Sequence, residues 1–172
     1  MKRLHAQNGY SLIEIMAAIS VLAVLGGFAV PMVESTSSGI KLRDQANGIA
    51  DLLGLAKLRA ASQFSRARLY ADLAAESYVL QVWDAPTGDW ISEQAAIELP
   101  SGIDCGWGEL EEPPPNTQDA LAFAQPCLDK DGDAIDKSAC IMFNSRGIAI
   151  DKDNSPLGGN AFYLTDGTGV RA

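Results

Sequence analysis

A long run of uncharged residues near the N-terminus most constrains how this chain can fold. No Asp, Glu, Lys or Arg occurs from Ile15 to Val33, and most of these residues are apolar. A helix of this length is about long enough to span the hydrocarbon core of a bilayer. Lys2 and Arg3 precede the run, and the positive-inside bias would hold them in the cytoplasm. The sequence therefore predicts a single-pass membrane anchor.

Glu14 is the unusual residue of this region, because it stands at the edge of the apolar run and five residues after Gly9. A carboxylate within a membrane segment is costly and is by default a functional candidate. The alternative is that Glu14 lies at the interface and reaches water, and its position does not separate the two. A secretory signal peptide fits less well, since the run is too long and no Ala-x-Ala-like site follows it.

The N-terminus resembles the type IV prepilin cleavage and methylation motif, usually Gly-Phe-Thr-Leu-Ile-Glu, in residues Gly9-Tyr10-Ser11-Leu12-Ile13-Glu14. Pro31 lies where pilin helices often carry a kinking proline. The resemblance implies that a prepilin peptidase cuts after Gly9 and that the new amino group of Tyr10 is methylated. It also implies that Glu14 pairs with the N-terminal ammonium of a neighbouring subunit. Breaking one partner of such a buried pair costs roughly 3–5 kcal/mol.

The remaining sequence predicts an α+β fold, in which a long N-terminal transmembrane helix packs against an antiparallel β-sheet domain. Apolar residues recur at steps of three or four from Ile49 to Phe64, which favours an amphipathic helix. We expect one helix over 11–64, with a kink at Pro31. The expected regions are a leader (1–9), a transmembrane or filament-core helix (10–33), an amphipathic helix continuing into the head (34–68) and a β-rich globular domain (69–172).

Short runs of β-forming residues separated by turn residues predict the sheet. The expected strands are 78–83, 90–91, 96–99, 140–143, 148–150 and 160–165. The proline-rich segment 109–117 is expected to be an exposed loop.

Three more stretches resemble the GspH/FimT group of minor pseudopilins and pilins: Ala50–Ala61, Phe143–Gly147 and Asn160–Gly167. The resemblance implies a structural subunit that assembles into or primes a type IV pilus or a type II secretion pseudopilus. Its implied partners are other pilins or pseudopilins, contacted through the N-terminal helix, and the prepilin peptidase and methylase. The implied location is the bacterial inner membrane, with the head in the periplasm, and the filament after assembly.

A FimT-type minor pilin that binds DNA during natural transformation is the alternative function. The net charge of −9 argues against it, because an acidic body repels phosphate backbones. The DNA-binding role of some FimT-type pilins relies on arginines of a basic tail, whereas this sequence stops at Arg171-Ala172, so that either it is truncated or the final strand is absent. The densest basic cluster consists of Lys57, Arg59, Arg66 and Arg68. It is interpreted either as a contact for an anion or DNA, or as the solvated end of a helix.

The cysteines are Cys105, Cys127 and Cys140, and an odd number leaves at least one thiol unpaired in a monomer. Outside the cytoplasm a disulfide is plausible. The pair Cys127–Cys140 would close a short loop and is favoured over pairs that use Cys105. Three unpaired thiols are the alternative.

A calcium site is the one metal site that the sequence suggests. Asp129, Asp131 and Asp133 alternate as at the start of a calcium-binding loop. Ala134 and Cys140, however, stand where such a loop carries its glycine and its bidentate glutamate. A polar turn between two cysteines explains the same residues, so no cofactor is expected apart from this candidate.

Enzymatic chemistry finds little support in the sequence. The one histidine, His5, lies in the segment expected to be removed, so no histidine-based triad survives processing. Neither a Gly-x-Ser-x-Gly elbow nor a phosphate-binding glycine loop is present. We therefore expect a structural subunit rather than an enzyme, with a membrane-anchored periplasmic enzyme as the least favoured hypothesis.

Overall fold

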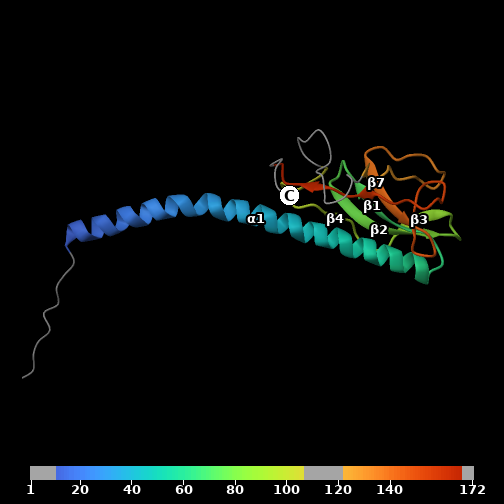
Figure 1. Ribbon diagram of the computed structural model, residues 1–172, viewed down its shortest axis with the longest axis horizontal. Coiled ribbons are helices and arrows are strands. Elements are labelled where there is room, and N and C mark those ends of the chain that lie inside the picture. Colours follow the sequence, from blue (N-terminus) through green and yellow to red (C-terminus); the bar gives the residue numbers. More distant parts are fainter. Residues whose placement is uncertain (1–10, 107–121, 168–172) are drawn as a thin grey trace, which may run out of the picture. The chain divides into compact units, whose positions relative to one another are not determined.

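The computed structural model describes residues 11–106 and 122–167, apart from the side chains of 26–36, 122 and 123. The chain divides into two compact units, Met1–Ser38 and Gly39–Ala172. Its elements are α1 (Leu12–Ser62), β1 (Ala67–Asp72), β2 (Ser77–Asp84), β3 (Asp89–Ser92), β4 (Ile97–Glu98), β5 (Asp104–Cys105), β6 (Ala122–Phe123), β7 (Ser138–Phe143), β8 (Ala149–Ile150), β9 (Asn160–Ala161) and β10 (Leu164–Thr165) (Figure 1).

Both ends of α1 are set by local backbone hydrogen bonds. At the start, the carbonyl of Ser11 accepts a hydrogen bond from the amide of Ile15 at 3.2 Å. At the end, Phe64 adopts a left-handed φ of 50°, and the amide of Ser65 donates to the carbonyl of Ala60 at 3.1 Å. This is the six-to-one bond of a Schellman-type C-cap, which stops the helix. The helix expected over 11–64 is thus confirmed apart from its end, while the kink at Pro31 stays a prediction.

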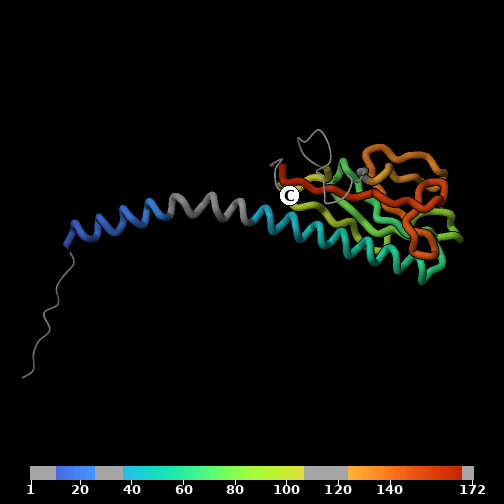
Figure 2. Tube along the Cα trace, viewed as in Figure 1, coloured from blue at the N-terminus to red at the C-terminus, as the bar shows by residue number. Residues whose placement is uncertain are grey.

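A six-stranded sheet forms the body of the second unit, and its strands are traced in Figure 2. The order is β3-β2-β1-β7-β8, with β4 also paired to β2, and every pairing in it is antiparallel. In the register of the central strand β1, Leu69 lies opposite Leu80 on β2 and Ile141 on β7. Together with α1, this sheet confirms the predicted α+β class.

The core lies between one face of the sheet and the second half of α1 (Figure 1). Ala56 and Ala60 of α1 are fully buried, and so is Leu69 of β1. Small helical side chains let the helix approach the strands closely, and the larger Leu69 and Leu80 fill the space beside them. Alternate residues of β1 and β2 point to the opposite, outer face of the sheet.

The structure differs from the expected strands at several points. The first strand, β1, was not predicted, and the expected boundary between residues 68 and 69 falls inside it. The strand lacks the usual alternation of buried and exposed residues, because Arg68 is buried on the outer face while Ala67 and Leu69 are buried in the core. The strand expected over 160–165 is two strands, β9 and β10, which pair with β6 and β5 respectively. The proline-rich loop 109–117 lies outside the described residues.

Candidate functional site

The first part of α1 is apolar on all sides and is not buried by its own chain. Every residue from 11 to 25 is exposed, and Leu12 and Leu22 expose 79% and 67% of their surface. Helices that are apolar all round are normally buried, in a large core or in a membrane. Among the described residues, no helix is both long enough and apolar enough to cross a membrane.

Glu14 lies in the first turn of α1 and is exposed. Its amide donates to the carbonyl of Ser11 at 3.0 Å, so it belongs to the helix start. The partial positive charge of a helix N-terminus favours a carboxylate at this place. Gly9 and Tyr10 lie outside the described residues, as does the side chain of Pro31, so their predicted roles remain predictions.

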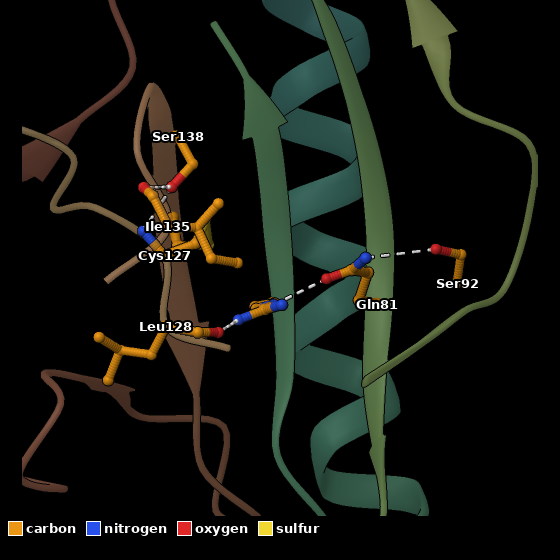
Figure 3. Close-up of a disulfide and its surroundings, with 8 residues drawn as sticks. Gln81, Ser92, Cys127, Leu128, Ile135 and Ser138 are labelled. Atoms are coloured by element: carbon orange, nitrogen blue, oxygen red, sulfur yellow. Dashed lines mark hydrogen bonds between the residues drawn. A yellow bond between two sulfur atoms is a disulfide. The ribbon is translucent and has the colours of Figure 1, made fainter. Parts of the chain in front are cut away.

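Arg68 is a cation on the outer face of the sheet, only 3% exposed. Its Nε donates to Oε1 of Gln81 at 2.8 Å, and its Nη1 donates to the carbonyl of Leu128. Gln81 in turn donates from Nε2 to Oγ of Ser92 at 3.3 Å. Figure 3 shows this chain of bonds crossing from the loop at Leu128 to Gln81 on β2 and to Ser92.

Two tryptophans stack with the arginines of this face. The guanidinium of Arg68 lies 3.9 Å from the ring centroid of Trp90, and that of Arg66 lies 4.5 Å from Trp83. The two indoles meet edge to face, with centroids 5.3 Å apart. Burial lowers the pKa of Arg68 to about 10, which still leaves the side chain cationic at neutral pH. Sequence reasoning missed both indoles, although Trp83 and Trp90 flank a clear turn.

A disulfide between Cys127 and Cys140 ties the loop that carries Leu128 to strand β7. The amide of Cys127 donates to Oγ of Ser138 at 3.0 Å, and the same hydroxyl donates to the carbonyl of Ile135 at 2.6 Å (Figure 3). These bonds fix the loop against the outer face, where Leu128 meets Arg68. Cys105 has a free thiol, and burial raises its pKa to about 11.

The four basic residues predicted as an anion or DNA contact do not share one open surface. Arg59 is paired with Glu93, with its Nε 2.8 Å from the carboxylate oxygen. A Cβ at Gly147 would lie 3.0 Å from Cγ of Lys57, so Lys57 lies against the turn at Gly147. Arg68 is buried, which leaves Arg66 beside Trp83. The structure thus separates Lys57 and Arg59 from Arg66 and Arg68, which line one cleft together, and the anion contact stays a prediction.

The predicted calcium ligands form a turn. Oδ1 of Asp129 accepts hydrogen bonds from the amides of Asp131 and Asp133, both at 2.9 Å. These bonds, the one from Asp133 first, hold the pKa of Asp129 below its usual value. In the described part of the chain, no three acidic, histidine or cysteine side chains are placed to hold a metal ion. The three aspartates thus belong to a polar turn, and their role as calcium ligands stays a prediction.

A cleft of about 430 Å³ opens over the outer face of the sheet. Arg66, Arg68 and the two indoles line one part of it, and the disulfide-tied loop lines another. The apolar part is lined by Pro126, Leu128, Ile141, Met142, Ala149, Ile150 and Leu157.

Comparison with known proteins identifies the N-terminal segment. Residues 4–30 match the prokaryotic N-terminal methylation motif, so the chain carries this prepilin-type signal. No curated protein matches the sequence. Among solved structures, the chain is similar to the minor pseudopilin EpsH from the type 2 secretion system of Vibrio cholerae, at 15% identity and a TM-score of 0.37. That alignment covers 72% of this chain and 95% of the other.

Proposed function

We propose that this chain is a minor pilin or pseudopilin of the GspH/FimT type, a structural subunit rather than an enzyme. The observation that carries the proposal is the methylation motif over residues 4–30, which runs directly into a helix whose apolar side chains are exposed all round. Such a surface is too apolar to remain in water and calls for burial outside its own chain. A bundle of like helices in a filament provides that burial.

The proposed mechanism is mechanical. Before assembly, the uncharged run Ile15–Val33 anchors the subunit in the bacterial inner membrane, with the head in the periplasm. A prepilin peptidase removes the leader after Gly9, and the amino group of Tyr10 is methylated. During assembly Glu14 pairs with the N-terminal ammonium of a neighbouring subunit, and helix contacts replace lipid contacts. Its exposed position at the start of α1 leaves the carboxylate accessible to such a partner.

Substitution of Glu14 tests the assembly mechanism. Glu14→Ala should remove the subunit from sheared filaments, because a neighbour's ammonium would be left buried without its counter-charge. The matched control is Glu98→Ala, which removes an exposed carboxylate from β4 in the head. The measurement is the amount of subunit in filaments relative to membranes. Equal incorporation of Glu14→Ala and wild type would overturn the mechanism.

Deletion of the gene tests whether the subunit belongs to a type II secretion pseudopilus or to a type IV pilus. Lost exoprotein secretion with intact surface motility would place the subunit in a type II secretion pseudopilus, which is one form of the proposal. Lost motility or DNA uptake with normal secretion would place it in a type IV pilus, which is the other. No change in any of the three would contradict the proposed role. The net charge of −9 argues against a DNA-binding role.

A further inference from the structure

The cleft on the outer face holds positive charge that no carboxylate neutralises by contact. Arg66 and Arg68 both line it. The ion pairs among the described residues join Arg59 to Glu93, Lys130 to Asp131 and Lys152 to Asp153, and none includes these two arginines. Arg68 is held by the neutral oxygens of Gln81 and Leu128. In a chain of net charge −9, such a pair of cations beside a cavity is complementary to an anion.

The other charged groups of the cleft are engaged locally. Asp129 accepts amides of its own turn, as described above. Oδ1 of Asp151 likewise accepts hydrogen bonds from the amides of Asp153 and Ser155, at 2.9 and 2.8 Å. Lys152 pairs with Asp153 at 2.9 Å. These carboxylates remain anionic, and Asp89 and Asp129 act on Arg68 through space without touching it. At the aromatic end, Arg66 and Arg68 are the charged side chains that line the cleft.

Arg66 is the arginine with donor groups to spare. Within the described residues its side chain forms no hydrogen bond or ion pair, and its guanidinium stacks on Trp83. A stacked guanidinium keeps its N–H groups in its own plane, where a carboxylate can accept two of them side by side. Arg68 lies two residues along the chain and is itself stacked on Trp90, so it adds a fixed positive charge beneath the same region.

We propose that this cleft binds an acidic peptide segment of a partner protein. A carboxylate of the segment is held by the guanidinium of Arg66 above the charge of Arg68. A neighbouring apolar side chain of the segment packs on the part lined by Met142 and Leu157. The cleft volume of about 430 Å³ lies within the range of sites for small ligands, and it suits a few residues of peptide. Nucleic acid is also anionic, but its long row of phosphates is repelled by the acidic body more strongly than one or two carboxylates of a short segment.

This site goes beyond the proposed filament role, because it lies in the head domain and uses none of the residues of the methylation motif. The two proposals can therefore fail separately. A subunit that assembles normally and binds no peptide would overturn only the cleft proposal.

The test uses the full chain in detergent and the peptide acetyl-Ala-Asp-Leu-Glu-Ala-amide, titrated by calorimetry. We expect saturable binding that is absent for acetyl-Ala-Asn-Leu-Gln-Ala-amide. Arg66→Gln should weaken binding roughly tenfold or more, because a hydrogen-bonded charge contact is lost. Arg146→Gln removes an exposed arginine outside the cleft and should bind as wild type. Tryptophan fluorescence gives a second readout close to the site.

Several outcomes would overturn the assignment. They are no binding of the acidic peptide, equal binding of the two peptides, and equal loss in Arg66→Gln and Arg146→Gln. Titration with inorganic phosphate and with a short single-stranded oligonucleotide separates the other anions. If either of these bound through Arg66 and the peptide did not, the cleft would be an anion site of another class, and the peptide proposal would be wrong.

Discussion

At the scale of single residues, the outer face of the sheet depends on Arg68. A buried arginine is expensive unless its donors are satisfied. Here an amide oxygen, a loop carbonyl and an indole face satisfy it without a carboxylate. The same side chain therefore links the sheet to the loop and supplies the charge of the cleft.

Removal of this side chain should destabilise the head. In Arg68→Ala the Oε1 of Gln81 and the carbonyl of Leu128 lose their donor, and a buried space is left. We expect a loss of about 2–4 kcal/mol in the free energy of unfolding, measured by urea denaturation. Arg146→Ala, at an exposed position, should change it by less than about 0.5 kcal/mol. Equal stabilities of the two variants would contradict the structural role of Arg68.

The free thiol of Cys105 should react slowly in the folded protein. Burial raises its pKa from 9.0 to about 11, so at pH 8 the thiolate fraction falls roughly a hundredfold. Because the folded state favours the protonated thiol, this contribution to stability is present below pH 9 and declines as the pH rises through 11. Labelling with a thiol reagent in buffer and in urea compares the reaction rates of Cys105 in the folded and the unfolded protein. Equal rates would show that Cys105 is accessible in the fold.

At the scale of elements, the sequence predicted those that form by local rules and missed those that depend on distant partners. The helix and the strands β2, β3 and β7 have strong periodicity or composition. By contrast, β1 is defined by its two neighbours in the sheet, and β5 and β6 are short segments paired across the chain. The stacking of Arg66 and Arg68 on the indoles was hidden for the same reason, since it needs the register of β1, β2 and β3.

The contribution of the disulfide to stability can be tested by reducing it. Cys127 and Cys140 are separated by 13 positions in sequence, and a closed loop of this size contributes about 3 kcal/mol to stability. Reduction should therefore lower the unfolding temperature of wild type, as measured by calorimetry. Cys105→Ser should show the same drop on reduction. Cys140→Ser should already be destabilised and respond little. A wild-type transition unaffected by reductant would contradict the role of this bond.

At the scale of the whole molecule, two kinds of surface stand out. One is the exposed apolar part of α1, which calls for burial by lipid or by other subunits. The other belongs to the head, whose described residues form one hydrophobic core and whose outer face carries a charged cleft. This combination suits a subunit that is held in an assembly by its helix and presents its head for contacts with other proteins.

The mature N-terminus of the protein, isolated from the membranes of its own cells, tests this account most directly. Intact-mass and N-terminal peptide spectrometry should find a chain that begins at Tyr10 and carries one methyl group on its amino nitrogen. A strain without prepilin peptidase should retain the leader. A wild-type chain that keeps the bond between Gly9 and Tyr10 intact would contradict the account and leave only a plain membrane anchor.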